Sequence, residues 1–416
     1  MSSTTGSRAS SAPTPPFPWV GLVTLSLLVF TSVTSEFLPT GLLPDMAREL
    51  GVSESQVGIL VTVFAGTVVV TAAPLATLTR RFSRKYLILA VLGIFIVGNV
   101  LAAVAPNYEV LLVARVIGGL AHGLFWSVVG AYSGHLVPRH QVGRAVAIVS
   151  GGGTAAFVLG VPVGTALGHL LGWRVAFAII AGITLLLTLV TLKFLPPVRH
   201  IAPLATGEIA LPLRKDKSIP GVVLLCILIV MIITGHNIFY TYIAPFLIGP
   251  VGLDEGAVAG VLFLYGGAGA IGVLLAGLLV DRYPRAALAA SLVGIMATVL
   301  TVGLVPHNPW VAVPAIVAWS IAFGGIPSMV QTRMLHTASA RLRDVASAYQ
   351  TTAFNIGIGG GALIGGIILD YWSITALPFV DIAITASALV LLFVGDRWLH
   401  SRARRITPTE PVPTVG

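Results

Sequence analysis

A few residues able to carry or exchange a proton lie inside long apolar stretches of this 416-residue sequence. Glu36 is an acid in one such stretch, where a low dielectric disfavours the charged form and allows proton uptake and release near neutral pH. Arg115, His122 and Trp126 share another stretch. On a helix of 3.6 residues per turn these three lie within about 40° of one another, so they line one stripe. The pattern predicts proton coupling through Glu36, Arg115 and His122.

Each of these residues also has a structural interpretation. Glu36 can be a neutral, hydrogen-bonded acid that anchors its helix. A charge buried in a bilayer is costly, so Arg115 must face the bundle interior or water and must have a partner. His122 can simply form a hydrogen bond across helices. Asp381 is a further candidate for proton coupling, and the sequence leaves open whether it titrates or pairs with a basic group.

Polar and aromatic residues elsewhere are predicted to line a cavity for a solute. His236, Asn237 and Tyr240 lie just before Pro245, at spacings that include i and i+4. Such a cavity suits amphiphilic or hydroxylated solutes, although packing or interfacial anchoring is the simpler explanation of any single aromatic. The other predicted members are Trp126, Tyr265, Trp319, Gln331 and Asn355.

The elements that must position these residues are membrane-spanning helices. The chain is 56% hydrophobic and only 9% charged, which excludes a water-soluble globule, because soluble domains are about a quarter charged. A helix needs about 20 mainly apolar residues to cross a bilayer. The sequence therefore predicts an all-α membrane protein. Its twelve spans are expected near 18–43, 56–78, 86–105, 109–134, 144–169, 172–195, 219–247, 256–280, 286–305, 309–334, 346–370 and 373–395.

Basic residues predict the orientation of these spans. Twelve spans place both tails on the same side of the membrane. All but three of the 24 Lys and Arg residues fall on that side, in the tails, in alternate loops or at the helix ends beside those loops. Positive loops stay in the cytoplasm during insertion, so we expect both termini to be cytoplasmic and the protein to lie in the inner membrane. The net charge of +9 is then explained by topology, with no need for nucleic acid.

The two halves of the chain repeat each other. Gly160 and Gly164 have counterparts 201 positions later, at Gly361 and Gly365. Parallel repeats of this kind are a common plan of transporters. The predicted organisation is a disordered tail at 1–17, six-helix bundles at 18–195 and 219–395, a cytoplasmic linker at 196–218, and a tail at 396–416.

Two loops are candidates for a cytoplasmic gate. An acid stands beside two arginines in the run Asp281-Arg282-Tyr-Pro-Arg285, where charge-assisted bonds can hold two bundles together and release them. The matching loop of the first half keeps Arg81 and Arg84. Anchoring by positive charge is the alternative explanation of both loops.

These loops resemble those of the major facilitator superfamily, and the resemblance covers nearly the whole chain. The run from Gly277 to Arg285 is similar to the family's Gly-x-x-x-Asp-Arg-x-Gly-Arg-Arg signature. Arg80 stands where the first copy of that signature has Asp, which weakens any acidic gate in the first half. Arg115-Val-Ile-Gly-Gly119 is similar to the Arg-x-x-x-Gly signature, which the family associates with proton transfer.

Two further motifs resemble its exporting branches. Small residues around Gly160, Pro162 and Gly164 resemble the Gly-Pro-x-x-Gly signature on span five of the antiporters, with generic helix packing as the alternative. The run from Glu36 to Pro44 looks like the Glu-Phe-x-x-x-Gly-Leu-Leu-Pro signature of drug and sugar efflux, which includes arabinose-type and nucleoside-type exporters.

The resemblance implies a secondary transporter that exports a drug, sugar or nucleoside-like solute by alternating access in exchange for protons. We expect the solute, protons and lipid as partners, a monomer, and no cofactor beyond the proton gradient. An importer or uniporter on the same fold is the main alternative. A membrane enzyme is disfavoured because no His-Glu-x-x-His, Gly-x-Ser-x-Gly or Cys pair occurs, and neither a catalytic residue nor a metal site is expected. A sensor is disfavoured because the sequence shows no sizeable soluble signalling domain.

Overall fold

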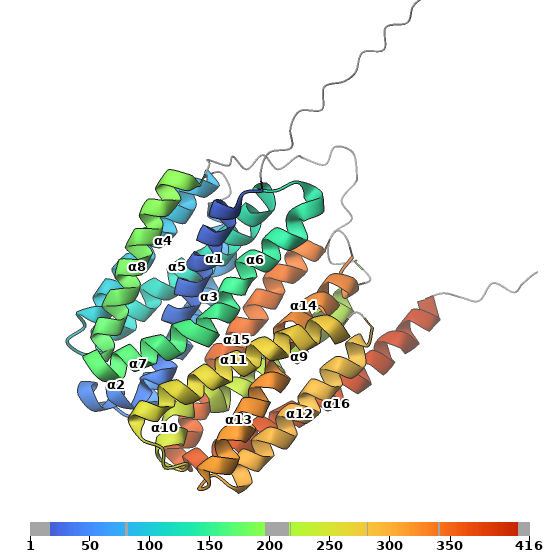
Figure 1. Ribbon diagram of the computed structural model, residues 1–416. Coiled ribbons are helices and arrows are strands. Elements are labelled where there is room, and N and C mark those ends of the chain that lie inside the picture. The colour runs from blue at the N-terminus through green and yellow to red at the C-terminus, as the bar shows by residue number, and fades with distance from the viewer. Residues whose placement is uncertain are drawn as a thin grey trace, which may run out of the picture.

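The structure, a computed structural model, describes residues 17–79, 82–195, 216, 218–280, 282–339 and 342–406. Every described element is helical, and twelve helical segments are long and apolar enough to cross a membrane, which confirms the predicted fold (Figure 1). The N-terminal half contains α1 (Trp19–Gly41), α2 (Leu43–Leu50), α3 (Glu54–Leu78), α4 (Arg84–Ala103), α5 (Tyr108–His135), η1 (Arg139–Gln141), α6 (Val142–Ala155), η2 (Ala156–Gly160), α7 (Val161–Leu171) and α8 (Trp173–Phe194). The C-terminal half contains α9 (Ile219–Tyr240), α10 (Ile243–Ile248), α11 (Glu255–Leu279), α12 (Pro284–Leu304), α13 (Pro309–Gly324), α14 (Ile326–Thr337), α15 (Arg343–Tyr371), η4 (Ile374–Ala376) and α16 (Leu377–Ile406).

The first span of each half is broken near its end, which the sequence prediction missed. The expected span 18–43 ends as α1 at Gly41, and α2 begins separately at Leu43. The expected span 219–247 divides into α9 and α10 around Tyr242. Pro44 and Pro245 lie just beyond the two breaks and have no N–H for the carbonyl four residues earlier, so neither first helix continues through them.

The last span extends farther than expected. The expected span 373–395 ends just before the charged Asp396, but α16 continues to Ile406. Asp396 is buried and bound by Arg285 and Arg333, so its charge does not stop the helix. Most of the predicted linker, 196–218, lies outside the described residues.

The repeated glycines pack each fifth span against the first span of its own half. Gly160 and Gly164 pack on α1, where a β-carbon at either would overlap a side chain. Gly361 and Gly365, which follow 201 positions later, pack in the same way on α9, and a β-carbon at either would lie 2.7 Å from an α9 or Tyr242 atom. Small residues thus let backbones approach closely in both halves.

The fifth span contains a turn of π-helix. This turn, η2, precedes Pro162 at the start of α7. Pro162 has no N–H for the carbonyl of Val158, and the helix widens where that bond is missing. The wider turn faces α11 of the other half, where Gly266 lies against the carbonyl of Phe157.

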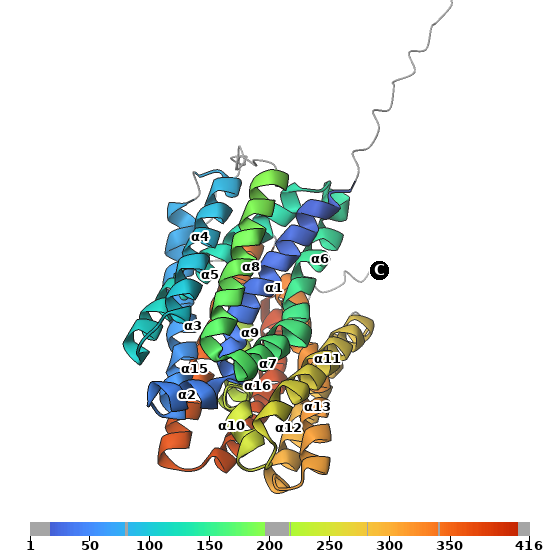
Figure 2. The same cartoon turned by 60° about the vertical axis from the view of Figure 1, so that its left-hand side comes forward.

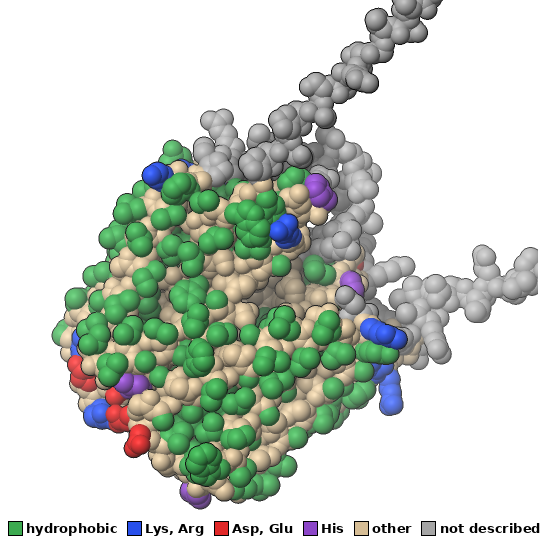
Figure 3. Space-filling model, viewed as in Figure 1, with side chains coloured by type: hydrophobic (Ala, Val, Ile, Leu, Met, Phe, Trp, Pro, Cys, Tyr) green, Lys and Arg blue, Asp and Glu red, His purple; other side chains and the backbone are tan. Residues whose placement is uncertain are grey.

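The two halves are joined around α2 and α10, at what we call the closed end (Figure 2). Here the hydroxyl of Thr62 on α3 donates a hydrogen bond to the carbonyl of Gly359 on α15, at 3.0 Å. Arg48 of α2 forms an ion pair with Glu255 of α11. Away from this end the halves spread apart, and a recess lies between them (Figure 3). We call that side the open end.

We expect the ion pair between Arg48 and Glu255 to favour the closed end only modestly. Its side chains are 63% and 44% exposed, and exposed pairs contribute about 1 kcal/mol or less. Glu255→Gln should therefore raise the labelling rate of a cysteine at Ser55, which lies between the halves, by up to about fivefold. Maleimide labelling in a Cys226→Ser background measures this. Asp254→Asn is the control, since it removes a neighbouring exposed acid, and an equal effect of both changes would exclude a specific latch.

Candidate functional site

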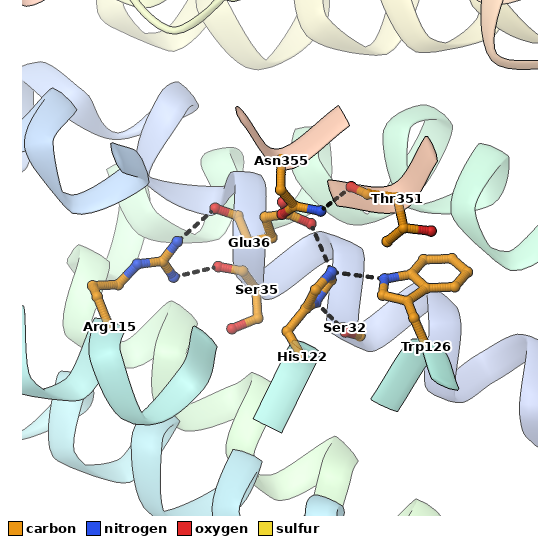
Figure 4. A network of polar contacts seen from close by, with 8 residues as sticks. All are labelled: Ser32, Ser35, Glu36, Arg115, His122, Trp126, Thr351 and Asn355. Carbon is orange, nitrogen blue, oxygen red and sulfur yellow. Dashed lines mark hydrogen bonds and ion pairs between the residues drawn. The ribbon is translucent and has the colours of Figure 1, made fainter. Parts of the chain in front are cut away.

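Glu36 lies at the centre of a buried polar network in the N-terminal half (Figure 4). Every residue of α1 from Thr31 to Gly41 is buried, because this part of the helix is surrounded by other helices. Ser32, Ser35 and Glu36 therefore point at protein, and they meet polar side chains from α4 and α5.

The imidazole of His122 joins three of these groups. The indole nitrogen of Trp126 donates a hydrogen bond to Nε2 of His122 at 2.7 Å. An indole can only donate, so Nε2 must be the unprotonated nitrogen of a neutral ring. Nδ1 then carries the hydrogen and donates it to the hydroxyl of Ser32, at 2.9 Å.

The tautomer of His122 bears on the proton of Glu36. Oε2 of Glu36 lies 3.5 Å from Nε2 of His122. A carboxylate there would be repelled by the lone pair of that nitrogen, which already accepts from Trp126, whereas a neutral carboxyl is not. The geometry therefore fits a neutral Glu36 beside a neutral His122, which is a state that holds one exchangeable proton.

Arg115 has the partner that its burial requires, but that partner is the main chain. Its guanidinium donates to the carbonyls of Ser35, at 2.9 Å, and Glu36, at 2.8 Å, and lies 4.3 Å from the centre of the Phe64 ring. The Ser35 carbonyl is available because Pro39, four residues later, has no N–H. Arg115 thus fixes α1 at Glu36 and keeps a positive charge beside the acid.

The network extends on both sides of these residues. The hydroxyl of Ser35 donates to the side-chain oxygen of Asn99 on α4, at 2.7 Å. From the other half, Figure 4 shows Asn355 and Thr351 of α15 together with this network, and Asn355 donates to the Thr351 carbonyl at 3.0 Å. Ser32, Ser35 and Asn99 were not predicted as site residues. Each is a polar residue within an apolar stretch, which is the signal that could have identified them.

Four of the predicted cavity residues form one aromatic cluster in the C-terminal half. The ring of His236 lies 5.2 Å from Tyr240, 6.5 Å from Tyr265 and 4.9 Å from Trp319, measured between centroids. It also stacks on Phe323 at 3.4 Å. We call His236, Tyr240, Tyr265 and Trp319 the aromatic cluster.

The aromatic cluster reaches the N-terminal half through two phenylalanines. The ring of Phe37 on α1 lies 6.3 Å from Tyr240 and 4.9 Å from Phe157 of η2. Phe37 follows Glu36 directly in the chain. The polar network and the aromatic cluster therefore adjoin where the two halves meet.

Other predicted cavity residues lie elsewhere. Gln331 of α14 accepts a hydrogen bond from Gln350 of α15, at 2.7 Å. Asn237 donates to the carbonyl of Ile233 within α9 and packs where Gly361 crosses that helix. Neither makes a ring contact or side-chain bond with the aromatic cluster among the described residues.

The predicted gate is described only in part. Arg80, Arg81 and Asp281 lie outside the described residues. Arg84 begins α4, and Arg282 lies 5.5 Å from the ring of Tyr283.

The remaining gate residue, Arg285, is engaged within its own half. Its Nε lies 3.0 Å from Oδ2 of Asp396, and Arg333 binds the other oxygen. Sequence analysis missed this role of Asp396, which it assigned to the C-terminal tail.

Asp381, the unexplained acid, is fully buried on α16. It accepts a hydrogen bond from Thr385 at 3.0 Å. The described residues contain no group of three or more His, Cys, Asp or Glu that could hold a metal ion.

Comparison with solved structures supports this architecture. The chain is similar to a bacterial homolog of the human lysosomal transporter Spinster in an inward-facing and occupied conformation, with 18% identity, a TM-score of 0.68, and coverage of 94% of this chain and 98% of that one. The unoccupied inward-facing form matches with 18% identity, a TM-score of 0.67, and coverage of 96% and 100%. At this identity the likeness establishes the fold alone.

The sequence itself establishes the family. Residues 25–362 match the profile of the Major Facilitator Superfamily. This match covers most of the twelve spans and includes Glu36, Arg115 and His122. The chain is a multi-pass membrane transporter of a small solute and belongs to the Major Facilitator Superfamily.

Proposed function

We propose that this protein exports a small organic solute across the cytoplasmic membrane in exchange for protons, and that Glu36 carries the proton. The observation that supports this proposal is the placement of Glu36, buried and 3.5 Å from an imidazole nitrogen that accepts from Trp126. An acid held this way is neutral at rest and becomes charged when its proton leaves. The nearby guanidinium of Arg115 stabilises the charged form.

The aromatic cluster supports the solute side of the proposal. Its flat rings and polar edges suit a solute with both apolar and hydroxyl groups, such as a drug, sugar or nucleoside. Because Phe37 links Glu36 to Tyr240, a solute bound there lies close to the acid. Solute binding from the open end would favour release of the proton, and proton uptake from the other side would favour release of the solute.

The same proposal assigns the open end to the cytoplasm and places both termini there. The positive loops support this orientation. With the closed end outside, the described conformation receives solute from the cell. Rocking of the two halves around Glu36 and the aromatic cluster would then expose the solute to the exterior.

Proton flux in inside-out vesicles tests the proposal. We expect ethidium, adenosine or arabinose to dissipate a preformed proton gradient, reported by a fluorescent pH probe, only in vesicles that contain the protein. A solute that crosses without disturbing the gradient would indicate a uniporter instead. Gene deletion followed by a broad toxicity screen extends the panel, and no gradient response with any solute would remove the basis for antiport.

A further inference from the structure

Asp381 is a carboxyl that the proposed mechanism does not use. It is fully buried on α16, in the half of the molecule opposite to Glu36. One oxygen, Oδ1, accepts the hydrogen bond from Thr385, whereas Oδ2 is buried without a hydrogen-bond partner. A buried polar atom without a partner is costly, so this oxygen calls for an explanation.

An ion pair does not supply that explanation. No Lys, Arg or His among the described residues lies within ion-pair distance of Asp381, and the arginines of this half that bind an acid of α16, Arg285 and Arg333, both bind Asp396, farther along the helix. An isolated charged carboxylate is very costly to bury, so the described conformation requires the neutral acid. Oδ2 then carries a hydrogen that is not engaged by any described group.

The packing of α9 on α16 leaves room for this acid. A β-carbon at Gly235 of α9 would lie 2.8 Å from Oδ1, so glycine there makes space for the carboxyl. His236 follows Gly235 in the chain, and the hydroxyl of Tyr265 on α11 lies within electrostatic range of Asp381. The only titratable residue of α12 is Arg285, which is bound to Asp396.

We infer that Asp381 is a second proton-binding carboxyl, which exchanges its proton with the solute cavity through the aromatic cluster. The hydroxyl of Tyr265 is buried and has no partner for its hydrogen. Because neither the Tyr265 hydroxyl nor Oδ2 of Asp381 has a hydrogen-bond partner, the transfer needs a bridging water. The acid gives its proton to that water, the water gives one to the phenol oxygen, and the phenol gives its own to water of the cavity, so Tyr265 ends the exchange unchanged. Glu36 and Asp381 would then give each half one proton-binding acid, an inference that rests on the proposed antiport.

Infrared spectroscopy tests the protonation of Asp381 without any solute. Purified full-length protein in lipid nanodiscs is taken through a pH step, and the carbonyl stretch of buried protonated carboxyls is recorded. We expect two such bands, of which Glu36→Gln removes one and Asp381→Asn the other. A spectrum of Asp381→Asn identical to that of the unaltered protein would overturn the inference.

A second variant guards against misfolding of Asp381→Asn. Thr385→Val removes the hydrogen bond to Oδ1 but keeps the carboxyl, so the same band should shift to higher frequency and persist. A band that does not move would assign the signal to another residue and overturn the inference. This spectroscopic shift separates a proton-binding role from a merely structural one.

The number of protons per solute tests the inference in transport. In proteoliposomes, the membrane potential at which flux reverses is measured with whichever of ethidium, adenosine or arabinose moves protons. Asp381→Asn should lower the proton-to-solute ratio while coupled transport persists, and an unchanged ratio would overturn the inference. Absence of proton flux in the unaltered protein would instead contradict the proposed antiport, so the two failures are distinguishable.

Discussion

Replacement of Glu36 by Gln is expected to abolish export against a solute gradient and leave downhill exchange in place. The amide has the shape of the neutral acid, so the network with His122 should persist, and solute affinity should change by less than about tenfold, or 1.4 kcal/mol. What the amide cannot do is release a proton. Solute accumulation in inside-out vesicles, with and without a proton gradient, measures the loss.

The same change at an exposed acid provides the control. Glu109 lies on α5, the helix that carries His122, but the Glu109 side chain is exposed, and Glu109→Gln is therefore the control. It should retain full uphill export. Unimpaired export by Glu36→Gln would remove Glu36 from the mechanism.

The second large effect is expected where the backbones of the two halves lie against each other, at Gly266 and Phe157. A β-carbon at Gly266 of α11 would overlap the carbonyl of Phe157 in η2, and backbone cannot move aside as a flexible side chain can. Gly266→Val should therefore push the halves apart near the closed end and stop transport. Labelling of a cysteine at Ser55 should become at least about tenfold faster, which corresponds to 1.4 kcal/mol or more.

The neighbouring residue gives a closely matched control. A β-carbon at Gly267 would meet no atom within 4 Å. Gly267→Val makes the same chemical change in the same helix and should leave both labelling and transport unaltered. If the two variants behave alike, helix propensity and not the contact with Phe157 explains the loss.

Much of the fold followed from two simple patterns in the sequence. Apolar length identified the twelve spans, and the 201-residue offset related Gly160 to Gly361, which pack alike on the first span of each half. The breaks after Gly41 and Tyr240 were missed, because the apolar stretch continues through them. Pro44 and Pro245 were the available signals, since each removes a bond that the helix needs.

The candidate site was less predictable, because its contacts depend on how helices pack. Helical spacing predicted that His122 and Trp126 lie on the same face of one helix, and in the structure a hydrogen bond joins them. Arg115 was expected to have a partner, and that partner is the backbone of α1. No spacing rule reports a contact between helices that are 80 residues apart in sequence.

Arg115 of α5 binds main-chain carbonyls of α1, so the packing of these two helices does not depend on the charge at position 36. A main-chain carbonyl is present whatever the side chain, so the hydrogen bonds of Arg115 remain when the acid at position 36 is replaced. If transport is coupled to protons as proposed, a single substitution at position 36 removes that coupling while the bundle stays assembled. Under the proposed antiport, the proton-binding acid can therefore change without loss of the helix packing that surrounds it.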